Sequence, residues 1–200
     1  LNIGWVFVGH DVCFGYKGEG KAEKLKIYCE ERGIGCDIMP PVMLDGRVVS
    51  STYIRKIIAD GDMEEATRYL GHPHTLSDTV HSGYHIGRKL GTPTINMHFP
   101  EGVIIPRHGV YAAKVYLEGG ESYVAVTNVG IRPTVGNGNS VTVESHLLDY
   151  SGNLYGRQAR VEFYKFLRPE RKFSGFEELS AQIRCDAESA KEYFESADKK

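Results

Sequence analysis

Hydrophobic residues follow two different periods along this chain of 200 residues, and the change of period divides it. In residues 1–71, short apolar runs alternate with segments whose apolar residues recur every three or four positions. That order is typical of an α/β region. From residue 72 onward, alternating segments and closely spaced turn signals predict antiparallel strands. We therefore expect an α+β chain with one region over residues 1–71 and a second over residues 72–200.

Residues 1–71 contain the signals of a parallel strand–helix–strand unit. The apolar run at 5–8 ends at a glycine and is typical of a strand buried in a parallel sheet. A helix is expected over residues 21–32, because glycines follow it, and a second strand over residues 36–39. Two short helices are expected before residue 71. The region therefore resembles a partial α/β domain.

Residues 72–200 are expected to form a small antiparallel sheet followed by one helix. The Gly119-Gly120 pair marks a hairpin turn between two of the strands. Many short antiparallel strands of this kind predict a small closed β-barrel. The strands are expected at residues 75–81, 96–99, 109–117, 122–129, 141–148 and 157–167.

The last helix has a clear starting signal in the sequence. Ser174-x-x-Glu177 is a capping box, in which each side chain binds a free backbone amide of the other residue. Apolar residues then recur at three- and four-residue steps from Phe176 to Phe194, which predicts an amphipathic helix packed on the barrel. Arg184 and Asp186 lie off this stripe and are expected to be solvated.

One acidic residue, Glu144, lies in the middle of a predicted strand. Alternation places it with His146 on the face opposite Val143 and Leu147. A glutamate is uncommon at such a position, and its burial without a partner is costly. Glu144 is either a solvated side chain of an edge strand or a functional carboxylate. His146 is interpreted as a packing residue or as a residue that supports the functional side chains around it.

A glycine-rich segment joins the first two strands of the second region. Gly83, Gly87 and Gly91 permit tight turns and close approach of a ligand to the backbone. Backbone amides exposed in such a loop bind phosphate oxygens, and Arg88 adds a planar donor group suited to phosphate. The alternative is a hairpin loop with solvated cations, and spacing alone favours neither interpretation.

The same segment ends in a Pro-Thr-x-Asn sequence. Pro93 restricts the backbone, and Thr94 and Asn96 carry oxygen atoms of the kind that Mg²⁺ accepts beside water and substrate phosphates. The segment is neither a Walker A sequence nor a dinucleotide-binding fingerprint. A magnesium–nucleotide site is therefore one hypothesis among others at this point.

Composition narrows the classes of partner. The formal net charge is −2, so a general field for binding nucleic acid is not expected. No apolar run reaches membrane-spanning length, and no signal peptide is apparent. The four cysteines lack metal-type spacing, which favours reduced thiols in the cytoplasm. The chain begins inside an apolar run without Met, so we expect a piece of a longer protein.

The glycine-rich segment and several later motifs resemble those of riboflavin kinases, in order, from about residue 70 to the C-terminus. Asp78 stands where that family usually has Gly, and Ile95 where it usually has Ala. The motifs are Gly83-x3-Gly87-Arg88-x-Leu90-Gly91-x-Pro93-Thr94-x-Asn96, Asn128-Val129-Gly130-Ile131-Arg132-Pro133-Thr134, Val143-Glu144-Ser145-His146, Leu154-Tyr155-Gly156 and Leu167-Arg168-Pro169-Glu170.

The resemblance implies an ATP:riboflavin 5′-phosphotransferase that makes FMN with Mg²⁺. It implies that Glu144 is the catalytic base and that Thr94 and Asn96 bind the metal. Arg168 and Phe173 belong to the implied flavin side, although Arg168 equally fits a surface ion pair with Glu170. The implied ATP-binding residues are Gly83, Gly87, Arg88, Gly91, Pro93 and Tyr155. A non-catalytic flavin-binding barrel is the alternative, but it does not need Thr94, Asn96 or Glu144.

The first region resembles the second half of the FMN adenylyltransferase domain of bacterial bifunctional FAD synthetases. Asp11 and Phe14 match its flavin-side motif. Its triphosphate-binding motif corresponds to Ser50, Ser51, Thr52 and Arg55. An ordinary capped helix also explains that hydroxyl-rich stretch. The His-x-Gly-His motif of such enzymes does not occur in the 200 residues, so we expect an incomplete adenylyltransferase site.

Overall fold

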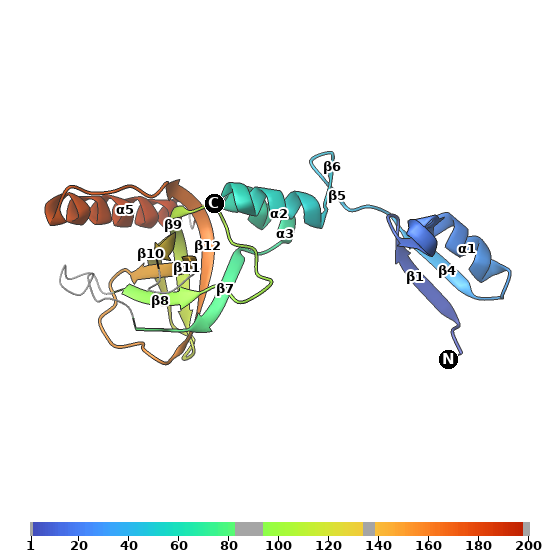
Figure 1. Cartoon of the computed structure of the whole chain (residues 1–200), viewed down its shortest axis with the longest axis horizontal. Coiled ribbons are helices and arrows are strands. Elements are labelled where there is room, and N and C mark those ends of the chain that lie inside the picture. The colour runs from blue at the N-terminus through green and yellow to red at the C-terminus, as the bar shows by residue number, and fades with distance from the viewer. Residues whose placement is uncertain (1, 83–93, 134–138, 198–200) are drawn as a thin grey trace. The chain divides into compact units, whose positions relative to one another are not determined.

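The computed structural model describes residues 2–82, 94–133 and 139–197, which fall into two compact units (Figure 1). The N-terminal unit comprises Leu1–Ser50 and the C-terminal unit Ser51–Lys200. The boundary expected at residues 71/72 separates helices from strands along the sequence. The contacts between residues place the helices of residues 51–70 in the same unit as the strands that follow them. The domain boundary expected at residues 71/72 stays a prediction.

The N-terminal unit is a parallel strand–helix–strand unit, as its sequence pattern predicts. β1 (Trp5–Gly9) pairs in parallel with β4 (Gly35–Met39), and α1 (Ala22–Glu30) connects them and packs against both. Two small hairpins complete the unit. Their strands are β2 (Cys13–Phe14), β3 (Gly20–Lys21), β5 (Met43–Leu44) and β6 (Arg47–Val48), and a single 3₁₀ turn spans Tyr16–Gly18.

The expected burial of β1 is wrong in this chain. Trp5 is 57% exposed and Phe7 67% exposed, whereas Val6 and Val8 are half-buried. The reason is that α1 covers one face of a two-stranded sheet, and alternate side chains of β1 point to the other face. The apolar run therefore predicted the strand correctly but not how much of it is covered.

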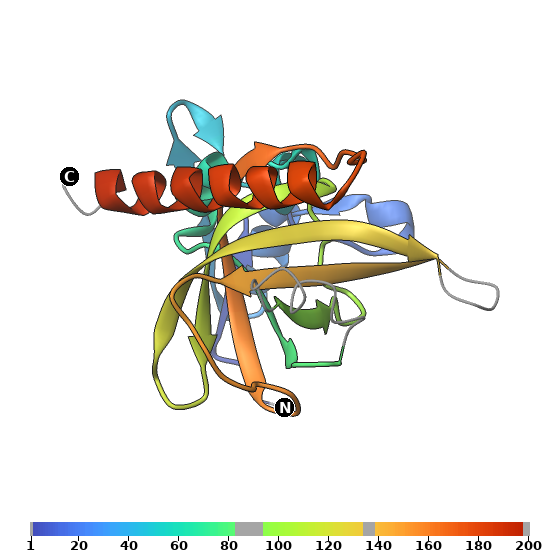
Figure 2. The ribbon, with the colours of Figure 1, turned by 90° about the vertical axis from the view of Figure 1, so that its left-hand side faces the viewer.

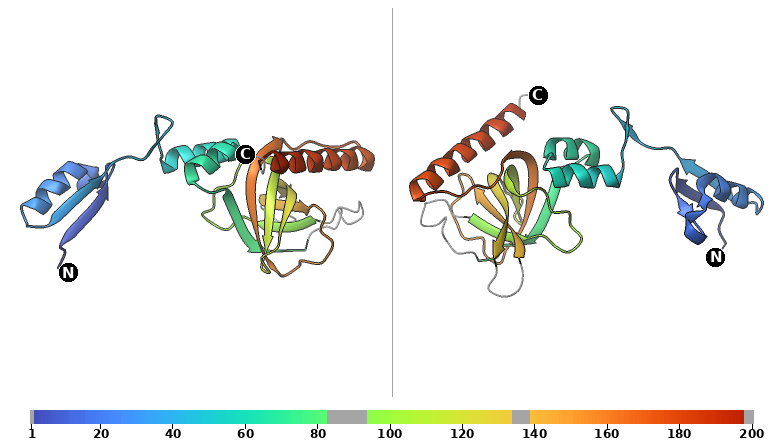
Figure 3. Two further views of the ribbon diagram at one scale, coloured as in Figure 1. Left: turned by 180° about the vertical axis from the view of Figure 1, so that it is seen from behind. Right: turned by 45° about the horizontal axis from the view of Figure 1, so that its top comes forward.

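Two helices open the C-terminal unit, α2 (Ser51–Asp60) and α3 (Met63–Leu70). The Asp62 side chain accepts a hydrogen bond from the Glu65 amide at 3.1 Å and caps α3, and Gly71 ends it with a left-handed φ of 78°. α3 packs against β7 and β12 of the sheet (Figure 3). These helices are thus part of the structure that supports the sheet.

Six antiparallel strands form one curled sheet in the order β7-β12-β9-β10-β11-β8 (Figure 1). The antiparallel pairing agrees with the sequence prediction, which did not include the order of the strands. The strands are β7 (His74–Thr79), β8 (Thr94–His98), β9 (Gly109–Leu117), β10 (Ser122–Pro133), β11 (Asn139–Leu147) and β12 (Gln158–Arg168).

The barrel is not closed, contrary to expectation. Within the described residues, the edge strands β7 and β8 share one isolated bridge, His81 to Asn96, and no ladder. The Asp78 carboxylate explains part of this, because it accepts a hydrogen bond from the His98 amide at 2.8 Å. A side chain therefore occupies the place of a backbone partner in β7. We call this open edge between β7 and β8 the seam.

The two faces of the sheet have different environments. The inner face carries the main core, with Tyr111, Phe163, Val129, Val143 and Met97 almost fully buried. On the outer face, α5 (Phe176–Ala197) lies across β9 and β10 (Figure 2). Its contact is a separate apolar cluster, which contains Val110, Ala112, Val126, Ala190 and Phe194.

The start of α5 differs in detail from the predicted capping box. The Ser174 amide and hydroxyl both bond to Glu178, at 2.9 and 2.8 Å, rather than to Glu177. The helix begins at Phe176, one residue later than the box implies, and this shifts the capping carboxylate by one position. These hydrogen bonds from Ser174, led by the one from its amide, lower the pKa of Glu178.

Candidate active site

Strand register brings the candidate catalytic and metal residues together. Glu144 on β11 lies directly opposite Asn96 on β8 and Asn128 on β10, and Thr94 lies opposite His146. Residues directly opposite each other in an antiparallel pair project from the same face, with Cβ atoms about 4.5–5.5 Å apart. The three residues 96, 144 and 128 therefore form a polar row across three strands.

The polar row lies on the outer face of the sheet, which is the face that α5 covers farther along. His146 is opposite Val126, and Val126 belongs to the cluster that packs against α5. The predicted alternation in β11 is confirmed, because Val143 and Leu147 are buried on the inner face while Glu144 is half-buried on the other. The glutamate is thus kept out of the core.

Asn96 has an unusual environment for a polar side chain. The residue is 6% exposed, and its Oδ1 atom is buried and has no hydrogen-bond partner among the described residues. An unsatisfied buried oxygen costs about 1–3 kcal/mol. A cation would satisfy it, and Thr94 lies two residues away on the same face and is half-buried. The two oxygens therefore fit the ligand chemistry of Mg²⁺.

The chain that follows β12 reaches the same polar row. Asn128 donates a hydrogen bond from Nδ2 to Glu170 Oε1 at 3.0 Å. Gly130 makes room for this contact, because a Cβ atom there would lie 2.3 Å from Glu170 Oε1. The expected flavin-side segment therefore borders the row that contains Glu144.

Arg168 is held by an ion pair with α5. Its guanidinium donates to both carboxylate oxygens of Asp186 at 2.8–3.2 Å, and Gln182 donates to the same carboxylate at 2.7 Å. The alternative pair with Glu170 is not the contact that forms. The expectation that Asp186 is solvated is wrong: its side chain is 6% exposed, because it is the shared partner of the Arg168 and Gln182 side chains. The Arg168 guanidinium carbon also lies 5.7 Å from the centre of the Phe173 ring.

The loop that carries Tyr155 lies beside the end of β7. The Gly156 amide donates to the Val80 carbonyl at 2.9 Å, and the Val80 amide donates to the Arg157 carbonyl at 2.9 Å. Tyr155 is 40% exposed in this loop. It is therefore held close to the strand that leads into the glycine-rich segment. The remaining expected ATP-binding residues, Gly83, Gly87, Arg88, Gly91 and Pro93, lie outside the described residues.

The residues that resemble an adenylyltransferase are divided between the two units. Asp11 is exposed in the turn after β1, and Phe14 packs its ring over Gly20 in the small hairpin. Those two residues lie in the N-terminal unit, and α2 of the C-terminal unit begins at Ser51. Ser50 ends the N-terminal unit, while Ser51, Thr52 and Arg55 are exposed on the first turns of α2.

Sequence reasoning missed two parts of this arrangement. The contact between Asn128 and Glu170 joins residues 42 positions apart, and nothing local in the sequence indicates it. Asp78, His81 and His98 also lie together, with their ligand atoms within 4.8 Å of one another. The signal for that cluster was the carboxylate at residue 78, where the resemblance leads one to expect glycine.

Comparison with known proteins agrees with this arrangement. A family model described as riboflavin kinase matches residues 70–194. The chain belongs to the riboflavin kinase family. A second model, described as FAD synthetase, matches residues 1–53, so the two matches together span both regions of the sequence.

Curated relatives align with nearly the whole chain. A bifunctional riboflavin kinase/FMN adenylyltransferase from Listeria monocytogenes is 36% identical over 194 residues, which are 97% of this chain and 61% of the relative. One of the same description from Haemophilus influenzae is 38% identical over 196 residues, or 98% of this chain and 63% of the relative. The chain thus spans about three fifths of the length of these relatives.

A solved structure has the same fold. It is described as a macrolide-efflux protein from Streptococcus pneumoniae, and it superimposes with a TM-score of 0.82 at 31% identity, covering 92% of this chain and 58% of that one. None of the helices in the described ranges combines the length and apolar character that crossing a bilayer requires.

Proposed function

We propose that this chain transfers the γ-phosphoryl group of ATP to the 5′-hydroxyl of riboflavin, which yields FMN and ADP. The observation that carries the proposal is the polar row, in which Glu144 lies opposite Asn96, whose buried Oδ1 has no partner within residues 2–82, 94–133 and 139–197. Membership of the riboflavin kinase family supplies the substrate class. A site with a carboxylate beside oxygen ligands for a cation suits phosphoryl transfer to an alcohol.

Glu144 is the proposed general base. As the riboflavin 5′-oxygen forms its bond to the γ-phosphorus, the bond from that phosphorus to the β,γ-bridging oxygen breaks and ADP leaves. The hydroxyl proton passes to the Glu144 carboxylate. Glu144 is half-buried on a strand, and a carboxylate positioned there suits the in-line geometry of the reaction.

Thr94 and Asn96 are the proposed magnesium ligands, through Oγ1 and Oδ1. Mg²⁺ in this place would neutralise part of the phosphate charge that develops during transfer. Asn96 is fixed by its position in β8, and its backbone carbonyl accepts a hydrogen bond from the His81 backbone amide at 2.8 Å. The protein thereby holds a ligand oxygen ready without rearrangement.

The remaining contacts follow from the segments around the row. We assign the ATP phosphates and base to Gly83, Gly87, Arg88, Gly91, Pro93 and Tyr155, and the flavin side to Arg168 and Phe173. The contact between Glu170 and Asn128 supports the flavin assignment, since it holds residues 168–170 beside the row. In this assignment Arg168 stays in its ion pair with Asp186, and its main role is to hold residues 168–170 in position beside the flavin.

We further propose that residues 1–53 belong to an FMN adenylyltransferase region, and that the parent protein makes FAD from the FMN it produces. The FAD synthetase match and the bifunctional relatives support this proposal. A cytoplasmic location also stays a proposal. The free thiols of Cys13, Cys29, Cys36 and Cys185 support it.

The decisive experiment replaces Glu144 by Gln. The change keeps the shape of the side chain but removes the group that takes the proton, so kcat for FMN formation should fall about 10²–10⁴-fold. Riboflavin affinity, measured by flavin fluorescence, should stay within a few-fold, since the lost interaction belongs to the transition state. Glu162→Gln is the matched control, because Glu162 is also half-buried in the middle of a strand, and it should retain its turnover.

The alternative outcomes separate the hypotheses. A fall of less than about threefold in a folded Glu144→Gln protein would reject the base assignment, because general-base contributions are far larger. Wild-type protein that binds riboflavin but never phosphorylates it with Mg-ATP would instead support the non-catalytic flavin-binding barrel. Asn96→Leu should weaken the use of Mg-ATP more than the binding of riboflavin, and an unchanged Mg²⁺ dependence would reject the metal assignment.

A further inference from the structure

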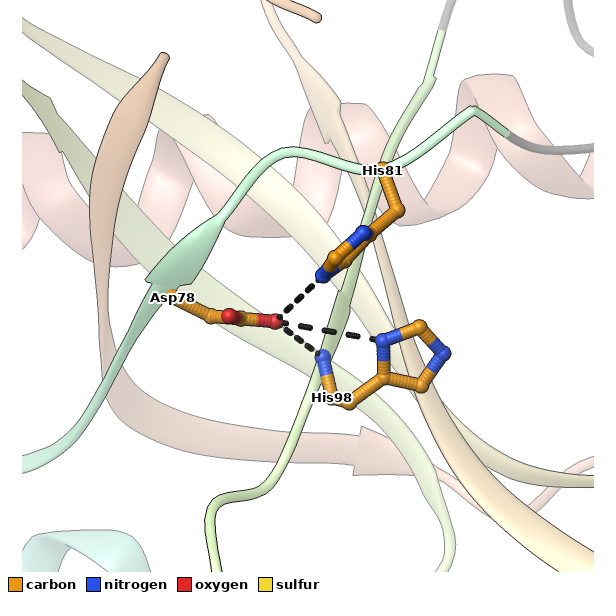
Figure 4. Close-up of side chains that lie close together, drawn as sticks. All are labelled: Asp78, His81 and His98. Carbon is orange, nitrogen blue, oxygen red and sulfur yellow. Dashed lines mark hydrogen bonds and ion pairs between the residues drawn. The ribbon is translucent and has the colours of Figure 1, made fainter. Parts of the chain in front are cut away.

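Three potential metal ligands meet at the seam between β7 and β8 (Figure 4). Asp78 lies in β7, His81 follows that strand, and His98 ends β8. The His81 Nε2 atom lies 3.2 Å from Asp78 Oδ2, and the His98 Nδ1 atom lies 3.9 Å from the same oxygen. Figure 4 shows both imidazole rings turned toward this carboxylate.

The carboxylate of Asp78 is fixed in place by the backbone. Its Oδ1 accepts a hydrogen bond from the Thr79 amide at 2.7 Å, and its Oδ2 accepts one from the His98 amide at 2.8 Å. The Asp78 side chain is only 23% exposed, whereas the two imidazoles are 47% and 48% exposed. One ligand is thus held rigidly, and the other two are free to adjust by side-chain rotation.

We propose that Asp78, His81 and His98 form a binding site for a first-row transition-metal dication of the Zn²⁺ type. Zinc binds imidazole nitrogen and carboxylate oxygen at about 2.0–2.2 Å in tetrahedral geometry, so neighbouring ligand atoms stand roughly 3.3 Å apart. The separations of 3.2 and 3.9 Å already approach that spacing. The exposed side of the cluster leaves room for water as the fourth ligand.

The ligand chemistry separates this site from the proposed magnesium site. Imidazole suits zinc, copper, iron and nickel, whereas magnesium prefers oxygen ligands. The two sites are nevertheless adjacent, because the backbone amide of His81 donates a hydrogen bond to the backbone carbonyl of Asn96. A metal held by residues 78, 81 and 98 would tie β7 to β8 where, in the described part of the chain, one isolated backbone bridge joins them. Its expected effect is therefore on the stability of the sheet, and the inference does not depend on the proposed kinase activity.

The test is a titration of the purified, tag-free chain with Zn²⁺ alone. Calorimetry measures the affinity and stoichiometry, and thermal unfolding measures the change in stability. Two variants remove ligands, His81→Gln and His98→Gln, and both residues are exposed enough for the fold to persist. His72→Gln is the matched control, because His72 is an exposed histidine outside the cluster. Co²⁺ serves as a second probe, since its visible absorption reports the ligand geometry.

The expected result is one equivalent of Zn²⁺ that binds the wild-type chain and the His72→Gln variant and raises their unfolding temperature. Each ligand variant should bind that equivalent at least about tenfold more weakly and lose the thermal shift. Excess Mg²⁺ should not displace the zinc. Equal zinc affinity and stoichiometry in all four proteins would overturn the inference, as would displacement of the zinc by Mg²⁺.

Discussion

The two units of this chain differ in how much of their apolar surface they cover. In the N-terminal unit, a two-stranded sheet has one helix on one face, and the aromatic side chains of Trp5 and Phe7 stay exposed on the other. In the C-terminal unit, the six-stranded sheet and helices α2, α3 and α5 of the described residues bury large side chains such as Tyr111 and Phe163 almost completely.

This difference bears on function as well as on stability. The C-terminal unit holds Glu144, Asn96 and Thr94 in fixed register on its own sheet. The N-terminal unit carries Asp11 and Phe14 on a small hairpin and a turn, with little packed structure to orient them. The comparison predicts one active unit and one that contributes motif residues without a complete site.

The largest expected difference is in the two activities. With riboflavin and Mg-ATP, the chain should accumulate FMN and form no FAD, because the His-x-Gly-His motif is missing from its 200 residues. Chromatographic separation of the flavins checks this directly. FAD in the product mixture of the purified chain would contradict the prediction that the N-terminal unit lacks a complete site.

The next largest effect is the difference in stability cost between removing a buried and an exposed aromatic side chain. Phe163→Ala should lower the free energy of unfolding of the C-terminal unit by about 3–5 kcal/mol, since it opens a cavity in the core. Phe7→Ala should change the stability by less than about 0.5 kcal/mol, because its side chain is already largely exposed. Trp5 is the single tryptophan, so its fluorescence reports on the N-terminal unit while far-UV circular dichroism follows the whole chain. A large cost for Phe7→Ala would indicate that this face is covered in solution.

A smaller effect is expected at the ion pair between Arg168 and Asp186. Asp186→Ala leaves a mostly buried guanidinium without its partner and should cost roughly 3 kcal/mol. Arg184→Ala is the control, because Arg184 is exposed on the same helix, and its cost should stay under about 0.5 kcal/mol. Urea unfolding measures both. Equal costs for the two variants would show that the ion pair does not fasten α5 to β12.

The smallest effect is a pH dependence that resides in the C-terminal unit. Burial lowers the pKa of His74, whose Nε2 lies 2.9 Å from the Ile104 carbonyl. The unfolded chain therefore takes up a proton more readily than the folded one, so stability is complete above about pH 6.5 and decreases as the pH falls below it. His74→Gln should reduce the loss of stability between pH 7.5 and about pH 5.5. An unchanged pH profile of the urea midpoint would reject this assignment.

Local patterns in the sequence were enough to predict much of the fold. The alternation in β11 placed Glu144 correctly on the face away from Val143 and Leu147, and two short helices do precede residue 71. Both predictions depend only on neighbouring residues.

Features that depend on distant residues were not predictable in this way. The exposure of Trp5 depends on how many elements cover its sheet, and the burial of Asp186 depends on an arginine 18 positions earlier in the chain. At the open seam, the Asp78 carboxylate accepts a hydrogen bond from the amide of His98, which lies 20 positions away in the sequence. In the candidate site, single positions were identifiable, but the row that joins them exists only through strand pairing.

The alternation of β11 has a practical consequence for engineering. Even-numbered positions 142–146 face the side of the sheet that carries the polar row, and odd-numbered positions 143–147 pack in the core. One strand thus carries two separate sets of positions, so variation at positions 142 and 146 that keeps Glu144 would leave the core side chains at 143–147 unchanged. A one-residue insertion would have the opposite result, because it would exchange the two sets and carry the carboxylate into the interior.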